Sequence, residues 1–352
     1  MAYPKPFAES TLAKKYKETG LSLETIEILK KFFISCSCLY GAIFAEDMWQ
    51  VYKELLGKGE VPRVKQKDIY GLLPILRRDG SMPFRVYEIS EIYADEKDRP
   101  KDRLLSHKEL TPPGVREDNY IYPLQQSQNF YAPYHVPDHF LDFQEIPVTK
   151  EEQRLLRYVG NLKVIKGVIK ESDSDPGKTY EHAGERLDSF CYLSDYEKFY
   201  LNYYKNKLLP IPRNLNILHA LENKFCKKNT AVKLVWEYKF LIYVGGRTPA
   251  QEFGLFMNDL NEVGADITRK RAEKLASLLF DMYNHSYLWT NRGWPPKLLA
   301  ETKMREMKAK GIQPSMPSIS FGPGIEQAIR EGKMDREELI RKIQELGMKV
   351  IT

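Results

Sequence analysis

Several features that would fix the class of this protein are scarce or absent in its sequence. The 352 residues include only four cysteines, too few and too scattered for a disulfide framework. No apolar run reaches the length of about 18 residues that marks a membrane span. The N-terminus lacks the apolar stretch of a secretory signal. We therefore expect a cytoplasmic protein that does not enter a membrane.

The motifs of common enzyme sites are also missing. The sequence contains no nucleophile elbow, no Gly-Lys-Ser/Thr phosphate loop and no dinucleotide-binding glycine pattern. Cys36 and Cys38 lie two residues apart, which on a helix turns their thiols to different faces and makes them a poor chelate. The sequence therefore favours a protein without enzyme activity and predicts no cofactor.

One short segment is a weak candidate for a metal site. His135, Asp138 and His139 place two imidazoles and a carboxylate within five residues, and three such ligands with an open position would make a catalytic zinc site. However, Pro137 disfavours the helix that would turn both rings toward one ion. No glutamate follows in the metalloprotease pattern. Packing of these histidines within a connector is the favoured interpretation.

The sequence does contain enough apolar residues for globular cores, at 42%, together with 29% charged residues. Its net charge of +6 comes from 54 basic and 48 acidic residues, so it permits nucleic-acid binding without requiring it. Aromatic residues make up 12% and are expected mainly in helical cores. The pattern along the chain predicts a mainly α-helical protein with a winged-helix-like N-terminal unit, an all-helical lobe and a C-terminal helical hairpin.

Residues 1–110 have the element order of a winged helix. A brief apolar link at 40–44 separates the first two expected helices, and a strand with alternating apolar residues follows the third. The expected elements are a helix beginning at Ser22, helices over 45–56 and 65–73, a strand over 84–89 and a short helix around Leu104.

The third of these helices would occupy the position of the recognition helix. The segment 58–78 carries six basic residues against Glu60 and Asp68, a net charge of +4. Such a helix could enter the major groove of duplex DNA, and the strand region could contact phosphates. The alternative is a solvated face on a unit that docks against the rest of the protein. The candidate nucleic-acid-binding residues here are Arg63, Lys65, Gln66, Lys67, Arg77 and Arg78.

Residues 111–147 are expected to form an ordered connector between two lobes. Six prolines recur along it and block regular helix, while its many aromatic residues argue against disorder. Tyr131 and Tyr134 from this segment, together with Trp289 and Trp294, are candidates for a protein-interaction surface.

The rest of the chain is predicted to be helical, as a domain over 148–296 and then a basic helix and a helical hairpin over 297–352. Capping boxes at Thr149 and Thr248 mark two of the helix starts. Arg269, Lys270 and Arg271 open another helix, where cations oppose the helix dipole, so they form a second candidate cluster for nucleic-acid phosphates. A solvated helix end is the simpler interpretation of that cluster.

The segment 278–299 resembles a loose group of uncharacterised bacterial proteins, in which a Leu-x-Asn-Asn-Thr-x-x-Trp-x-Asn-x-Gly-x-Thr-Pro-x-Glu-Leu pattern ends a helical domain. Members often carry a winged-helix-like N-terminal unit and a C-terminal SEC-C metal motif. That motif is absent here, because no cysteine follows Cys226. The resemblance implies an architecture and no activity. Asn284, Trp289, Asn291, Gly293, Pro296 and Leu299 match the pattern, whereas Met282, His285, Ser286, Pro295 and Leu298 differ from it.

The sequence thus leads to two hypotheses about function. The first is a non-enzymatic protein that binds nucleic acid, as duplex DNA, through the winged-helix-like unit. The second is a protein-interaction scaffold that uses the aromatic connector and the turn between Trp289 and Trp294. A metal-dependent enzyme at His135 and His139 is a third and weaker alternative. The sequence leaves the oligomeric state open.

Overall fold

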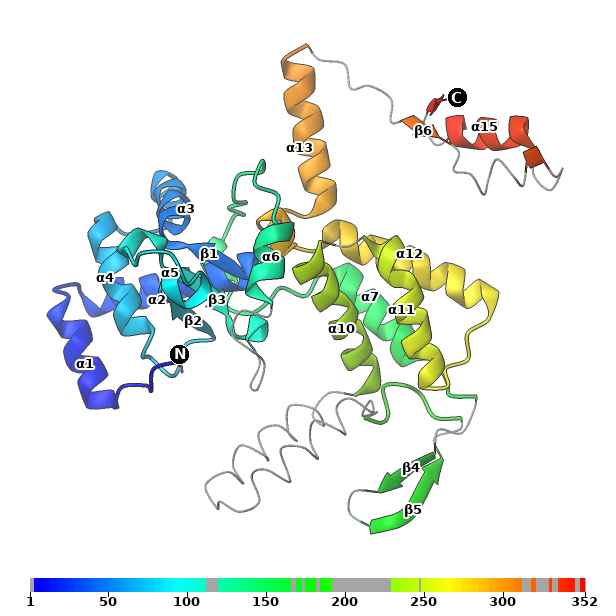
Figure 1. Cartoon of the computed structure of the whole chain (residues 1–352), viewed down its shortest axis with the longest axis horizontal. Helices are drawn as coiled ribbons and strands as arrows, with labels where there is room; N and C mark the ends of the chain where they lie inside the picture. Colours follow the sequence, from blue (N-terminus) through cyan, green and yellow to red (C-terminus); the bar gives the residue numbers. More distant parts are fainter. Residues whose placement is uncertain are drawn as a thin grey trace. The chain divides into compact units, whose positions relative to one another are not determined.

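The computed structural model is mainly helical (Figure 1). It divides into two compact units, residues 1–297 and 298–352. No helix in the described part of the chain has the length and apolar character that crossing a bilayer requires. The structure describes residues 3–111, 120–165, 169–172, 175–181, 184–191, 229–246, 248–311, 318–320, 329–330, 335–345 and 349–351.

The N-terminal region builds a small antiparallel sheet from three strands that are separated by helices. The central strand pairs with both neighbours, in the order β1-β3-β2. The elements are α1 (Glu9–Glu18), α2 (Leu23–Tyr40), β1 (Ala42–Phe44), α3 (Ala45–Lys58), α4 (Gln66–Leu76), β2 (Phe84–Tyr87), α5 (Ile89–Ile92), the 3-10 turns η1 (Pro100–Asp102) and η2 (Lys108–Leu110), and β3 (Leu104–His107).

The short helix expected around Leu104 is therefore wrong, since Leu104–His107 is the central strand. All four of its residues are buried. A strand covered on both faces lacks the alternation of apolar and polar residues that identifies a half-buried strand. Pairing with β1 and β2 decides its conformation, and neither partner adjoins it in the sequence.

The sheet lies between two hydrophobic cores. Ile43, Val86 and Leu105 pack with the side chains of α2, α3 and α4. Ala42, Tyr87 and Leu104, which point to the opposite face because side chains alternate along a strand, belong to the core of the helical lobe. The N-terminal region and the helical lobe are thus joined through one shared sheet.

Among the described residues of the helical lobe, four main helices pack around that second core. Side chains cap their starts: the Thr149 hydroxyl accepts the amide of Glu152 at 3.2 Å, and Asn229 accepts that of Val232 at 2.9 Å. The elements are α6 (Ile121–Ser127), η3 (Phe140–Asp142), α7 (Lys150–Gly160), the hairpin β4 (Ile169–Ser172) and β5 (Asp175–Glu181), α10 (Thr230–Gly245), α11 (Pro249–Glu262), α12 (Arg269–His285) and η5 (Trp289–Asn291).

The C-terminal region contains α13 (Pro296–Ala309) and α15 (Arg336–Glu345), and the parallel pair β6 (Ser318–Ser320) and β7 (Lys349–Ile351). In the region of the expected helical hairpin, the described residues are α15, the helical residues 329–330 and the pair of strands. The remainder of the expected hairpin lies outside the described residues, as do residues 112–119 of the expected connector.

Candidate functional site

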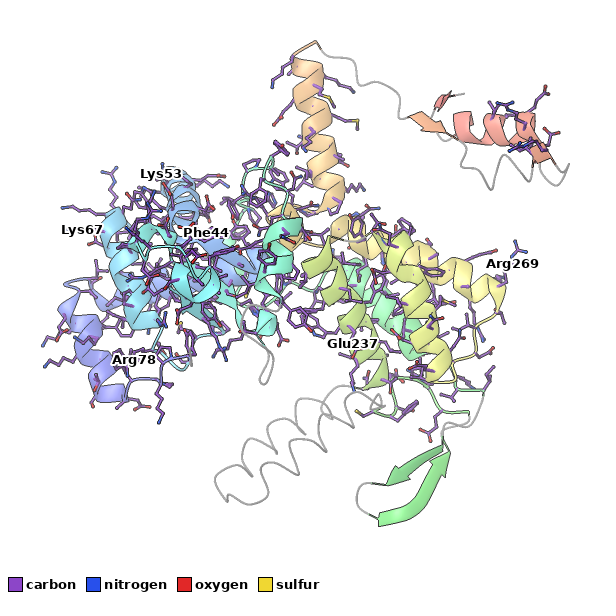
Figure 2. The ribbon with its side chains drawn as sticks, viewed as in Figure 1. Phe44, Lys53, Lys67, Arg78, Glu237 and Arg269 are labelled. Atoms are coloured by element: carbon purple, nitrogen blue, oxygen red, sulfur yellow. The ribbon has the colours of Figure 1, made fainter. Side chains whose placement is uncertain are left out.

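Three cations lie together at the start of α4. The side chains of Arg63, Lys65 and Lys67 are exposed, and in the described part of the chain no carboxylate lies within 4 Å of any of them. Asp68 is close in sequence, but its carboxylate accepts the Lys65 amide at 2.9 Å and so caps the helix. Figure 2 shows Lys67 extending outward from this end of the helix.

Gln66 accompanies these cations and is also exposed. Its side-chain amide donates to the Tyr70 hydroxyl at 2.7 Å, one turn further along α4. This hydrogen bond holds the amide against the helix surface. The start of α4 therefore offers three exposed charges and one positioned amide. That set suits phosphate contacts better than the reading of bases.

The other two arginines of the expected site have partners within the fold. Arg77 forms a bidentate ion pair with Glu91, at 2.5 and 2.6 Å, and the two side chains are only 16% and 10% exposed. Burial alone would raise the pKa of Glu91, but hydrogen bonds from Arg77 and the Glu88 amide hold it below its usual value. Arg78 lies 3.9 Å from the centre of the Phe7 ring and donates to the Lys5 carbonyl at 3.0 Å. Both arginines attach other segments to α4.

The loop between β2 and β3, residues 88–103, folds back on the helices. Its 3-10 turn η1 contacts both α3 and α4. Arg103 pairs with Glu88 at 2.9 Å and also donates to the carbonyl of Tyr70, at 3.4 Å. That carbonyl has lost its usual helical partner because Pro74 has no N–H. The loop carries six acidic and four basic residues, so its net charge of −2 opposes contact with phosphates.

The second basic cluster lies at the start of α12. Arg269 is exposed, as Figure 2 shows, and pairs with Glu273 at 3.1 Å. Lys270 is exposed as well. Arg271 forms an ion pair with Asp266 and donates to the carbonyl of the same residue at 2.9 Å. Arg271 differs from its two neighbours in that it lines a pocket of about 590 Å³ between α12 and α7.

The four aromatic residues expected on a protein-interaction surface fall into different environments. Trp289 is fully buried, so no outside partner can reach it in the folded chain. Tyr134 is mostly buried and packs on Tyr40, with ring centres 4.9 Å apart. Trp294 is half-buried and donates to the Pro133 carbonyl at 2.9 Å. Only Tyr131, at 97% exposed, presents its whole ring to solvent.

The candidate metal residues do not form a ligand cluster. The ring of His135 packs against Trp294, with centres 4.2 Å apart, and burial lowers its pKa to about 4. His139 is exposed in a left-handed conformation, with a φ of 57°. Over the described residues, no group of three or more His, Cys, Asp or Glu side chains is placed to hold a metal ion.

Sequence reasoning missed the other basic residues of the pocket between α7 and α12. Arg154 and Arg157 have helical spacing after the cap at Thr149, which was the available signal. Nothing in the sequence indicates that Lys163 and Lys274 line one pocket, because this depends on the packing of α7 against α12. The chain matches no protein-family model, no curated protein and no solved structure.

Proposed function

We propose that this protein binds duplex DNA without catalysing a reaction on it, through contacts between the start of α4 and the sugar-phosphate backbone. The observation that carries the proposal is the exposed set Arg63, Lys65 and Lys67 at one end of a helix, for which the described residues supply no carboxylate partner. Cations in that state release counterions from DNA when they neutralise phosphates, which supplies most of the affinity of non-specific binding.

The arrangement of elements around α4 supports a winged-helix interpretation of the unit. The order α2, β1, α3, α4, β2, β3, with α5 and η1 inserted before β3, and the sheet order β1-β3-β2 support this interpretation, under which α4 would take the place of the recognition helix. The proposed contact excludes the loop over 88–103, because that loop is acidic and tied to α4. It also excludes Arg77 and Arg78, whose partners lie within the chain.

The residues on the outward face of α4 indicate that binding depends little on the base sequence of the DNA. Lys67, Gly71 and Pro74 share this face and are exposed. Neither Gly71 nor Pro74 has a side chain that could read a base edge. Among the proposed contact residues at the start of α4, Gln66 has the side-chain amide that could bind adenine. That amide already donates a hydrogen bond to the Tyr70 hydroxyl. We therefore propose recognition through the backbone, with affinity that depends steeply on salt.

The test is a fluorescence-anisotropy titration of a labelled duplex at several salt concentrations. The variant Arg63→Ala/Lys65→Ala/Lys67→Ala should bind more weakly at low salt. Its slope of log affinity against log salt should be shallower by about 2 to 3, since each phosphate contact contributes about 0.9. The control Lys31→Ala/Lys150→Ala/Lys303→Ala removes the same charge from exposed positions on three other helices, α2, α7 and α13, and should keep the wild-type slope. Absence of binding at low salt, or equal losses in both variants, contradicts the proposal.

A second proposal, a protein-interaction surface, rests on Tyr131. Its ring is 97% exposed beside Phe130, which is 62% exposed. Asn129 fixes the turn through two hydrogen bonds. Its side-chain oxygen accepts the Tyr131 backbone amide at 3.2 Å, and its backbone amide donates to the Thr290 carbonyl at 2.7 Å. A rigid exposed aromatic residue is a common anchor of protein interfaces. Affinity capture with wild-type protein and Tyr131→Ala tests it, and identical sets of captured proteins contradict it.

A further inference from the structure

The helical lobe contains a basic pocket that is separate from α4. It lies where α7 and α12 pack side by side and has a volume of about 590 Å³. Two backbone hydrogen bonds link the two segments beside it. The Ile165 amide donates to the Gly264 carbonyl at 2.9 Å, and the Asp266 amide donates to the Lys163 carbonyl at 2.8 Å. These bonds fix the segment after α7 against the segment before α12, so the pocket has a defined backbone frame.

Cations from three segments line this pocket. Arg154 and Arg157 come from α7 and Lys163 from the paired segment after it, and Arg271 and Lys274 come from α12. Asp266 is the one acidic residue in the lining, and its carboxylate forms an ion pair with Arg271. Five positive charges against one negative charge leave a net charge of +4 around a single hollow.

The described part of the chain leaves most of this charge without a counter-charge. Among the described residues, Arg157, Lys163 and Lys274 have no carboxylate within 4 Å. Arg154 has only a distant partner, Glu151 at 3.9 Å, on an exposed turn. Like charges that converge without counter-charges repel one another, and a bound anion would relieve that repulsion.

The remaining lining residues suit a small molecule. Tyr158, Leu162 and Leu278 add an aromatic and apolar wall beside the cations, and Asn161 adds an amide. A volume of about 590 Å³ falls within the range of roughly 300 to 1,000 Å³ that is typical of small-molecule sites. Arginine is suited to phosphate because its planar guanidinium donates two parallel hydrogen bonds.

We propose that this pocket binds a small ligand that carries at least two phosphate groups. Lys163 and Lys274 face the hollow from opposite segments and contact the phosphates as point charges, while Arg154, Arg157 and Arg271 donate hydrogen bonds to their oxygens. Cations that converge on one open hollow from three segments fit a compact polyanion. A DNA backbone would instead need its cations spread along an open surface.

The lysines allow a clean test because their side chains have no partner within the described residues. Lys163 contributes to the fold through its backbone carbonyl, which accepts the Asp266 amide, and Lys163→Ala retains that carbonyl. Lys274 is exposed on α12, where alanine is a good helix former. Lys270→Ala is the matched control, because it removes the same charge from the same helix at an exposed position outside the pocket lining.

The experiment is isothermal titration calorimetry of the full chain with sodium tripolyphosphate, and with inorganic phosphate as the singly phosphorylated comparison. Wild-type protein should bind tripolyphosphate far more tightly than phosphate. Lys163→Ala and Lys274→Ala should each weaken binding about tenfold or more, with unchanged thermal unfolding of the unliganded protein. Lys270→Ala should bind as the wild type does. No heat of binding, an equal loss in Lys270→Ala, or displacement of tripolyphosphate by duplex DNA overturns the proposal.

Discussion

The indole nitrogen of Trp289 donates a hydrogen bond to the backbone carbonyl of Cys38 at 2.9 Å, across 251 positions of the sequence. The same ring lies against Gly41, the residue that ends α2. Gly41 has a φ of +70°, which L side chains rarely adopt. The tryptophan thus joins the end of α2 to the helical lobe at a point where only glycine leaves room.

Substitution of Gly41 should therefore destabilise the whole chain. An alanine Cβ would lie 2.6 Å from Cε3 of the Trp289 ring, in addition to the strained φ. We expect Gly41→Ala to lower the free energy of unfolding by at least about 2 kcal/mol, measured by urea denaturation. Gly57→Ala is the control, because Gly57 lies within α3 and an added Cβ there meets nothing within 4 Å. That variant should gain about 0.5 to 1 kcal/mol, and equal effects of the two substitutions would contradict the role of Gly41.

His107 should make the protein less stable in acid. Burial lowers its pKa to about 4, and its Nδ1 accepts the Glu109 amide at 3.2 Å, which requires a neutral ring. The unfolded chain takes up the proton below its usual pKa of about 6.5, so stability falls as the pH drops from about 6.5 toward 4. The difference between the pKa values of His107 in the folded and unfolded chain corresponds to a loss of at most about 3 kcal/mol in the free energy of unfolding.

Urea denaturation of His107→Asn at several pH values measures this contribution. Asparagine can accept the same amide hydrogen bond but does not titrate, so the loss of stability in acid should shrink by up to about 3 kcal/mol. His139→Asn is the control, since His139 is exposed and its left-handed backbone tolerates asparagine. A pH profile of His107→Asn that parallels the wild type would rule out this source of acid sensitivity.

The parts of the fold that sequence reasoning predicted are those with local signals. The cap at Ser22 and the apolar spacing after it mark α2, and similar spacing marks α3. β3 and the environment of Trp289 depend on partners far along the chain. The hydrogen bond of the Trp289 indole, for example, goes to the carbonyl of Cys38 in α2.

The candidate sites divide in the same way. The sequence located the exposed cations Lys65 and Lys67, because a helix start and its charges are local features. It also grouped Arg77 with them, although Arg77 forms an ion pair with Glu91, which follows β2 in the sequence. Charge counts along a sequence include cations that the fold has already paired. Only the tertiary structure separates these from the free ones.

The pair of Arg77 and Glu91 should matter for stability and not for DNA. Arg77→Met leaves a mostly buried carboxylate without its bidentate partner, which should cost about 2 to 4 kcal/mol in urea denaturation. Arg99→Met is the control, because Arg99 pairs with Asp102 on the surface and should contribute less than about 1 kcal/mol. Anisotropy titrations of folded Arg77→Met should keep the wild-type salt slope. A shallower slope would instead place Arg77 among the phosphate contacts.

The core of the helical lobe contains a buried ion pair whose two charges should depend on each other. Lys239 is 1% exposed, and its amine lies 2.7 Å from the Glu152 carboxylate and 3.0 Å from the Pro147 carbonyl. Burial lowers the pKa of Lys239, while attraction to Glu152 acts in the opposite direction. Each charge is therefore tolerated in the core because the other is present.

A double-mutant cycle measures this dependence. Lys239→Met and Glu152→Leu should each lower the free energy of unfolding by about 3 to 5 kcal/mol, since each leaves one buried charge alone. The double variant should be more stable than either single one, because it buries no charge and leaves only the Pro147 carbonyl without its donor. The exposed pair Lys15 and Glu18 gives the reference, and its coupling should be far smaller because solvent screens both charges. Additive losses at Lys239 and Glu152 would mean that the two residues stabilise the core independently, by packing and not by charge.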